Sequence, residues 1–309
     1  MGHLVLSRGV GPGALDSISN GENMKSPYYI NEPAAISFSG GRTSAYMLYK
    51  VLEAHSGKLP EEVKVTFANT GKEMPETLDF VQACSDNWDV PIVWLELASM
   101  KRTEREGKRT KIVTEYKIVD YKSASRNGEP FNILLDNMKA IPNAIARSCT
   151  GYMKVRAVSW YMREVAKETE AIQLVGIRGD EQRRAAKIHG KRHGESGGDR
   201  YCPLWVDGVT AKDVGDFWKS NNFDLQLPNN NGVTDWGNCD LCFLKAKSKR
   251  ISIIRERPDL ADWWAAAEKD KDQFFRPDQP SYEQMKIIAS DQGNLFEFDD
   301  ESIPCFCGD

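Results

Sequence analysis

The sequence predicts an α/β protein built on a mostly parallel β-sheet that is sandwiched by helices. Short apolar segments rich in β-branched residues recur along the chain, and amphipathic segments with helical periodicity separate them. Strands and helices that alternate in this way are typical of parallel sheets whose two faces are both covered, because the crossover helices pack on those faces. We expect these crossovers to be right-handed.

The expected elements begin at residue 34 and follow one another along the chain. Segments with the length and composition of buried strands are 34–39 (AAISFS), 63–70 (VKVTFANT), 91–97 (PIVWLEL) and 171–179 (AIQLVGIRG). Amphipathic segments that predict helices are 43–55 (TSAYMLYKVLEAH), 75–88 (PETLDFVQACSDNW) and 157–169 (AVSWYMREVAKET). Near the C-terminus the pattern becomes helical, as in 251–270 (ISIIRERPDLADWWAAAEKD).

The simplest organisation is one α/β domain with an extension at each end. Residues 1–33 contain too short an apolar segment for a secretory signal and read as a flexible N-terminal arm. Residues 34–245 would form the α/β domain, in which the rhythm of strands and helices is interrupted by an insertion at about 101–146. Residues 246–309 would form a helical extension and a tail that carries cysteines.

Composition and charge are those expected of a soluble globular protein. Hydrophobic residues make up 40% of the 309 residues and charged residues 28%. No run approaches the roughly 18 apolar residues of a membrane span, so we expect no membrane partner and a cytoplasmic location. The net charge of −4 offers no general attraction to nucleic acid.

One stretch departs from this overall charge. Residues 101–126 contain nine Lys and Arg against four Asp and Glu. Such a run is usually a solvated loop, and a lid that faces a polyanion is the alternative.

The turn SGGRTS joins the first expected strand to the first expected helix. A glycine-rich turn that opens a helix presents backbone N–H groups in a concave array, and the helix dipole adds about half a positive charge there. The glycines let phosphate oxygens approach the backbone, and the hydroxyl groups add donors. An ordinary tight turn with a Ser or Thr N-cap is the alternative. The residues of the turn are Ser39, Gly40, Gly41, Arg42, Thr43 and Ser44.

A second polar segment follows the next expected strand. Because the carboxyl ends of parallel strands meet at one edge of a sheet, and ligands of open α/β sheets bind there, we expect this segment to lie beside the SGGRTS turn. Its residues are Asn69, Thr70, Gly71, Lys72 and Glu73.

The turn resembles the PP-loop, the pyrophosphate-binding loop of ATP pyrophosphatases and sulfonucleotide reductases. Segments that resemble the phosphoadenosine phosphosulfate and adenylyl-sulfate reductase branch follow in the same order: NTGKE (69–73), RSCTGYMKV (147–155), GIRGDEQRR (176–184) and CPLWVDGVTAKDVGDFW (202–218). The resemblance covers about 34–245. It implies an adenine nucleotide alpha-hydrolase-like fold with a five-stranded, mostly parallel sheet.

The same resemblance implies an adenosine nucleotide as the ligand, either adenylyl sulfate, phosphoadenylyl sulfate or ATP, with Mg²⁺ as a further candidate. Gly176 and Ile177 join the nucleotide-binding residues on this basis. A charged tail needs fixed cations in a partly dry cleft, and arginine offers a bidentate fork. Solvated surface positions are the alternative for each candidate cation. These candidates are Arg147, Lys154, Arg178 and Arg183.

Three cysteines are candidates for an iron–sulfur cluster. Cys239 and Cys242 have C-x-x-C spacing, which is typical of redox pairs, zinc half-sites and cluster half-sites alike. Resemblance to the iron–sulfur reductases implies a 4Fe–4S cluster held by these two residues and Cys149. Those enzymes carry a cysteine pair where this chain has Ser148 followed by Cys149. Either Cys305 or Cys307 supplies the missing ligand, or one iron is left open. Three structural thiols that bind no metal are the alternative.

The C-terminal tail, PCFCGD, carries the candidate nucleophiles Cys305 and Cys307. Sulfonucleotide reductases hold their nucleophilic cysteine in such a tail, followed by glycine, although Asp309 departs from the family's ending. A thiolate that attacks the sulfur of a phosphosulfate would form S-sulfocysteine, and a thiol reductant such as thioredoxin would release sulfite. A frayed end with incidental cysteines is the alternative.

Three functions are compatible with these features. The leading hypothesis is a sulfonucleotide reductase-like enzyme with a 4Fe–4S cluster near its site. The second is an ATP-dependent PP-loop sulfurtransferase that releases pyrophosphate and modifies nucleic acid, by tRNA thiolation or DNA phosphorothioation, with residues 101–126 as the contact. The third is a nucleotide-binding scaffold whose metal site is structural.

Overall fold

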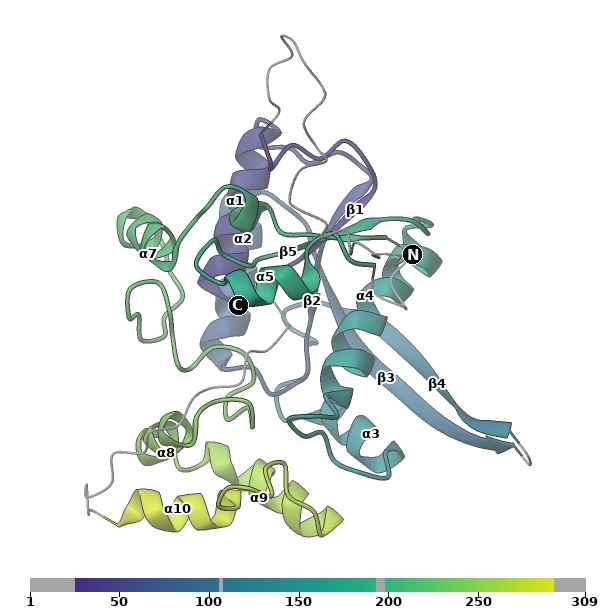
Figure 1. Cartoon of the computed structure of the whole chain (residues 1–309), viewed down its shortest axis with the longest axis vertical. Coiled ribbons are helices and arrows are strands. Elements are labelled where there is room, and N and C mark those ends of the chain that lie inside the picture. The colour runs from purple at the N-terminus through teal and green to yellow at the C-terminus, as the bar shows by residue number, and fades with distance from the viewer. Residues whose placement is uncertain (1–25, 106–107, 193–197, 292–309) are drawn as a thin grey trace, which may run out of the picture.

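The computed structural model describes residues 26–105, 108–192 and 198–291 (Figure 1). Its strands are β1 (Ala34–Ser37), β2 (Val63–Ala68), β3 (Ile92–Arg105), β4 (Lys108–Val119), β5 (Ile172–Val175) and β6 (Arg200–Tyr201). Its α-helices are α1 (Arg42–Ala54), α2 (Pro75–Trp88), α3 (Glu129–Asn137), α4 (Arg156–Trp160), α5 (Gln182–Ile188), α6 (Pro203–Val206), α7 (Ala211–Ser220), α8 (Lys247–Glu256), α9 (Leu260–Lys271) and α10 (Tyr282–Ser290). Two π-helical segments, η1 (Thr150–Val155) and η2 (Tyr161–Val165), flank α4.

The described strands form one sheet with the order β4-β3-β2-β1-β5-β6. β1 lies at its centre and is parallel to both neighbours, so that Ile36 stands opposite Val65 of β2 and Leu174 of β5. β2 and β3 are parallel, β5 and β6 are parallel, and only β3 and β4 are antiparallel among the described strands. The chain builds outward from β1 to β2 and β3, then returns to add β5 on the other side. This reversal makes the carboxyl end of β1 a topological switch point, where open α/β sheets bind ligands.

Helices cover both faces of the sheet, as the alternation of strands and helices predicts (Figure 1). Successive side chains of a strand point to opposite faces. Ala34 and Ile36 therefore pack into the core that contains α1, α2 and α7, whereas Ala35 packs into the core that contains α3 and α4. The prediction of an α/β sandwich with a mostly parallel sheet is confirmed.

The number of strands and the state of residues 101–126 differ from expectation. The sheet has six described strands rather than five, and residues expected as a solvated loop or lid lie in the antiparallel pair β3–β4. The reason is visible in 111–119 (KIVTEYKIV), where charged and apolar residues alternate with the period of a strand. The density of Lys and Arg concealed this alternation.

The helices α8, α9 and α10 are those that the helical pattern after residue 246 predicts. They share a hydrophobic core with α3, α4 and one face of the sheet, and they pack together as one helical group (Figure 1). Trp264, Phe275 and Tyr282 form its fully buried aromatic centre. Among the described helices, none is both long enough and apolar enough to cross a membrane.

Candidate functional site

The SGGRTS turn lies between β1 and α1 and is closed by its own hydroxyl groups. Gly41 is the N-cap of α1, and no side chain caps this helix. Instead, Ser44 Oγ donates to Gly41 O at 3.0 Å and accepts from Ser39 N at 3.1 Å. The first N–H groups of an α-helix have no partner within the helix. The turn therefore presents main-chain N–H donors at the positive end of the α1 dipole.

Two glycines allow this turn to pack closely. Gly40 has φ of +81°, and a Cβ there would lie 2.6 Å from Thr77 Cγ2 of α2. At the end of β5, a Cβ on Gly176 would lie 3.1 Å from the Cα of Ser44. The neighbouring Ile177 is fully buried in a small cluster with α5. Gly176 therefore sets the distance between β5 and the first turn of α1.

The side chain of Arg42 points away from the concave face of the turn. Its Nε and Nη2 donate to the carboxylate of Asp224 at 2.7 and 2.8 Å, and Nη2 also donates to Leu227 O at 2.9 Å. Only 3% of Arg42 is exposed. The guanidinium thus anchors the start of α1 to the segment after α7, and the contribution of this residue to an anion site would come from its backbone.

The polar segment after β2 is buried and its side chains are committed to other parts of the chain. Asn69 Nδ2 donates to Glu96 Oε1 at 2.7 Å, and the backbone N and the Oγ1 of Thr70 donate to the carboxylate of Glu73 at 2.8–2.9 Å. Gly71 O accepts from Gly128 N at 2.8 Å. These contacts make the segment a structural junction at the carboxyl edge of the sheet.

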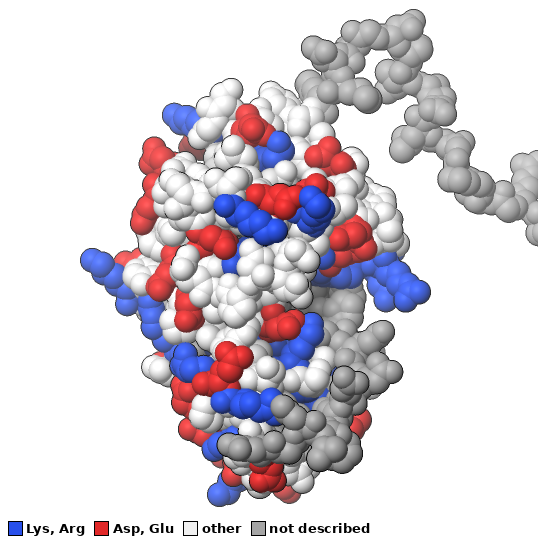
Figure 2. Space-filling model, turned by 90° about the vertical axis from the view of Figure 1, so that its left-hand side faces the viewer, with Lys and Arg blue, Asp and Glu red and all other residues white. Residues whose placement is uncertain are grey.

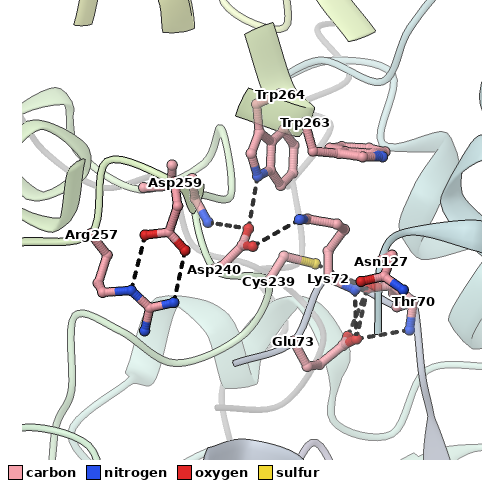
Figure 3. Close-up of polar contacts among 12 residues, drawn as sticks. Thr70, Lys72, Glu73, Asn127, Cys239, Asp240, Arg257, Asp259, Trp263 and Trp264 are labelled. Carbon is pink, nitrogen blue, oxygen red and sulfur yellow. Dashed lines mark hydrogen bonds and ion pairs between the residues drawn. The ribbon is translucent and has the colours of Figure 1, made fainter. Parts of the chain in front are cut away.

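Lys72 joins that junction to the C-x-x-C segment (Figure 3). Its Nζ lies 3.0 Å from Asp240 Oδ2 and 5.1 Å from the ring centroid of Trp263, and its carbonyl accepts from Asp240 N at 2.7 Å. Trp264 Nε1 donates to the other carboxylate oxygen of Asp240 at 2.7 Å. Both charges of the ion pair are buried, with side-chain exposures of 8% and 4%.

A cleft opens at the switch point, beside the SGGRTS turn. The empty space among its lining residues is about 640 Å³, a figure that includes open solvent. Ser37 lines the cleft, and its Oγ is buried and has no hydrogen-bond partner among the described residues. The described residues that line the cleft come from β1 and the turn after it, and from β2, η1, α4, β5, α5 and β6: Ser37, Phe38, Ser39, Thr66, Ala68, Thr150, Lys154, Val155, Val158, Gln173, Val175, Ile188 and Arg200.

Of the four candidate cations, Lys154 lines this cleft and Arg178 touches the turn. Lys154 lies on η1, and π-helical segments often occur at functional sites. Arg178 Nη1 donates to Thr43 Oγ1 at 3.3 Å, while its Nε donates to Asp180 at 2.9 Å. Asp180 therefore orients the arginine. Arg183 is exposed on α5 and is not among the residues that line the cleft.

Arg147 lies with the cysteines rather than in the cleft. Burial lowers the pKa of Arg147, and the nearby thiols of Cys242 and Cys149 raise it. Burial and the charge of Cys242 raise the pKa of Cys149 to about 12, whereas Lys154 lowers it. Burial and Glu73 raise the pKa of Cys239, and Lys154 lowers it as well. Cys242 is thus close enough to influence both other thiols, and Lys154, which lines the cleft, influences Cys149 and Cys239.

The chemistry of these donors fits a thiolate-ligated group, since all three are cysteines beside a cation. In residues 26–105, 108–192 and 198–291, however, no three His, Cys, Asp or Glu side chains are placed to hold one metal ion. The tail candidates Cys305 and Cys307 lie outside the described residues.

Some cleft residues were not identified from the sequence. Arg200 lines the cleft from β6, and burial lowers its pKa. Ser37, Thr150 and Gln173 contribute polar groups from β1, η1 and β5. Arg200 lies two residues before the CPLW segment, so its position offered a signal. Ser37 and Gln173 are strand residues, and only the pairing of β1 with β5 brings them together.

Comparison with known proteins agrees with this geometry. Residues 33–226, which include the turn, the cleft and the first helices, match the phosphoadenosine phosphosulfate reductase domain. The chain is also 30% identical over 216 residues to the uncharacterized nin region protein ORF290 of Escherichia phage lambda, a match that covers 69% of this chain and 67% of that protein. The chain therefore belongs to the phosphoadenosine phosphosulfate reductase domain family.

Proposed function

We propose that this protein is a sulfonucleotide reductase-like enzyme that binds an adenosine phosphosulfate in the cleft at the carboxyl end of β1. The observation that carries the proposal is the composition of this cleft. Ser39 of the SGGRTS turn lines it together with two cationic side chains, Lys154 and Arg200, while apolar and uncharged polar side chains form the rest of its wall. An adenosine ring and a sulfated or phosphorylated tail require this combination of apolar and cationic surfaces.

The main-chain N–H groups at the start of α1 would hold phosphate oxygens, because they are directed donors at a positive helix end. Arg178 would add charge beside Thr43, and Lys154 would approach the tail from η1. Ser37 Oγ, buried and without a protein partner among the described residues, would hydrogen-bond the nucleoside.

The reaction would begin when a tail thiolate, Cys307 or Cys305, attacks the sulfur atom of the phosphosulfate. A Cys S–S bond forms, the bond between sulfur and the bridging oxygen breaks, and the nucleotide leaves as a phosphate that keeps the electron pair. A dithiol such as thioredoxin then attacks the S-sulfocysteine. Sulfite leaves, the tail cysteine is restored, and the dithiol is oxidised to a disulfide.

A 4Fe–4S cluster is part of this proposal, with Cys149, Cys239 and Cys242 as its ligands. When bound by these residues, such a cluster would supply a position for a sulfur atom. Burial raises the pKa of both Cys149 and Cys239, and the charge of Lys154 partly opposes this at each thiol. Anaerobic purification with quantified iron and sulfide tests this part, and Cys239→Ser should lower both contents together.

The function is tested by supplying adenylyl sulfate or phosphoadenylyl sulfate with a dithiol and measuring sulfite. Lys154→Met and Arg200→Gln should each weaken nucleotide binding about 10- to 150-fold, because a hydrogen bond to a charged group contributes about 1.5–3 kcal/mol. Arg183→Gln is the matched control, since this arginine is exposed outside the cleft lining, and it should bind as wild type does. Equal losses of nucleotide affinity in all three variants would contradict the proposal that the nucleotide binds in this cleft.

A second candidate keeps the cleft and changes the reaction. The sheet extends past the cleft as a lysine-bearing hairpin, β3–β4, which favours ATP-dependent sulfur transfer to nucleic acid. ATP would be cleaved between its α and β phosphates, and pyrophosphate would be released. Pyrophosphate formed from ATP, without sulfite formed from a sulfonucleotide, would favour this candidate. Nucleotide binding with neither product would favour the scaffold.

A further inference from the structure

The β3–β4 hairpin extends well beyond the rest of the sheet. β3 pairs with β2 only from Ile92 to Leu95, yet it continues to Arg105. Ten further residues at about 3.3 Å each correspond to an arm of about 33 Å. Because β3 runs parallel to β1, the arm leaves from the carboxyl edge of the sheet, which is the edge that holds the cleft (Figure 1).

One face of the hairpin is attached to the body of the protein. Tyr116 is buried, its hydroxyl donates to Tyr152 O at 2.7 Å, and its ring centroid lies 5.7 Å from that of Trp160. Ile112 lies on the same face as Tyr116 and is packed against the same core. These contacts with η1 and α4 hold the described base of the hairpin in a fixed direction.

The opposite face, here called the outer face, is exposed. The strand register pairs Lys101 with Val113 and Thr103 with Lys111, so these four side chains share one face. All four are exposed, including Val113 at 41%. The outer face therefore presents two lysines, an aliphatic residue and a hydroxyl group on a two-stranded ribbon. The next pair on the same face is Ser99 with the exposed Glu115, whose carboxylate accepts from Ser99 Oγ at 2.6 Å.

Ion pairing distinguishes this surface from other lysine-bearing surfaces of the molecule. Among the described residues, neither Lys101 nor Lys111 takes part in an ion pair. On α7, by contrast, Lys212 and Lys219 both lie within 4 Å of Asp216, at 2.5 and 3.7 Å. Figure 2 shows that basic and acidic side chains alternate on the side of the molecule it presents. Lys101 and Lys111 thus keep positive charges that no ion pair within the described part of the chain compensates, whereas both lysines of α7 are paired with Asp216.

We propose that the outer face of the β3–β4 hairpin binds the phosphate backbone of a nucleic-acid duplex and holds it beside the cleft. Duplex DNA carries one negative charge per about 1.7 Å of its axis, so an extended arm faces a continuous row of charges. Lysines serve as point charges for phosphate, and contacts of this kind position a protein without reading the sequence. This binding does not depend on which reaction occurs in the cleft.

The test measures binding of the full chain to a labelled 25-base-pair DNA duplex, by fluorescence anisotropy at several salt concentrations. Lys101→Gln with Lys111→Gln should weaken binding up to about 60-fold at 0.1 M salt and lower the slope of log K against log salt by about 1.8, because each phosphate contact contributes about 0.9. Val113→Lys should act in the opposite direction and raise the slope by about 0.9. Lys212→Gln with Lys219→Gln removes the same charge from α7. It should change both the affinity and the salt slope by less than the hairpin variant does.

Several results would overturn the proposal. They are absence of duplex binding by the wild type at 50 mM salt, equal losses in the hairpin and α7 variants, and displacement of the duplex by polyglutamate at the same charge concentration. Duplex RNA and single-stranded DNA of equal length identify the preferred form of nucleic acid, and tighter binding of the single strand would contradict the duplex. Turnover of free nucleotide by the hairpin variant should equal that of wild type, so this test can fail without affecting the proposed function.

Discussion

At the residue scale, the shape of the SGGRTS turn depends on Gly40. Its φ of +81° lies in the left-handed region, where an L-residue with a side chain is strained. The space beside its Cα is also occupied, because an added Cβ would lie 2.6 Å from Thr77 Cγ2. Backbone conformation and packing therefore both require glycine at this position.

Gly40→Ala should lower the free energy of unfolding by about 2–4 kcal/mol, the sum of a left-handed backbone cost and an overpacking cost. Gly57→Ala is the matched control, because Gly57 has a similar φ of +86° but no atom within 4 Å of an added Cβ. It should cost only about 1 kcal/mol. Urea denaturation measures both values. If the two costs are equal, packing against Thr77 does not constrain the turn.

At the same scale, the backbone and the side chain of one residue can have different structural roles. The backbone of Arg42 belongs to the first turn of α1, whereas its guanidinium is bound to Asp224. A motif read from the sequence identifies the residue but not the direction of its side chain. That direction depends on where the segment after α7 returns to the sheet.

At the element scale, a buried ion pair connects the turn after β2 with the C-x-x-C segment and α9. Lys72 and Asp240 are held together with Trp263 and Trp264 of α9 (Figure 3). A buried charge that loses its partner is costly, because the low-dielectric surroundings solvate it poorly. The pair therefore makes the extension of α8, α9 and α10 dependent on the α/β domain.

Lys72→Met should lower the free energy of unfolding by about 3–5 kcal/mol, because Asp240 would remain buried without its cation. The double variant with Asp240→Asn should lose less than the sum of the two single variants, since the coupled charges are removed together. Chemical denaturation of all three measures the coupling. Arg257→Gln, which breaks the pair with Asp259 at 42% and 60% side-chain exposure, should cost at most about 1 kcal/mol. Additive losses would contradict the coupling.

At the scale of the whole molecule, two histidines make stability depend on pH. His55 Nε2 accepts from Ile30 N at 3.0 Å, before β1, and His189 Nδ1 accepts from Cys202 N at 3.2 Å, after β6. Burial lowers the pKa of both rings, although Glu62 partly opposes this for His55. An accepting ring nitrogen must be unprotonated, which agrees with the direction of both shifts.

Stability should therefore be fully present above the ordinary histidine pKa of about 6.5 and should fall as the pH decreases below it, since the unfolded chain binds protons that the folded chain excludes. His55→Gln with His189→Gln keeps an acceptor at each position and should flatten this dependence between pH 7.5 and 5.5. Thermal unfolding across that range measures it. An unchanged slope in the double variant would assign the dependence to other groups.

The sequence by itself determined the layered α/β architecture and the place of the SGGRTS turn. These features are local, because strand and helix periodicities and a glycine-rich turn depend on residues that follow one another in the sequence. The family resemblance extended this to the candidate cations and thiols. The strands within 101–126 were not predicted, because the many charged residues of this segment obscured a strand pattern that is present in 111–119.

Only the tertiary structure decided which of these residues meet. Pairing of β1 with β5 brings Ser37, Gln173 and Lys154 to one cleft with Arg200, whereas Arg183 remains on the surface of α5. The return of the chain after α7 turns Arg42 away from the site, and the packing of α9 commits Lys72 to Asp240. Contacts between residues far apart in the chain depend on sheet order and helix packing, and no local pattern records them.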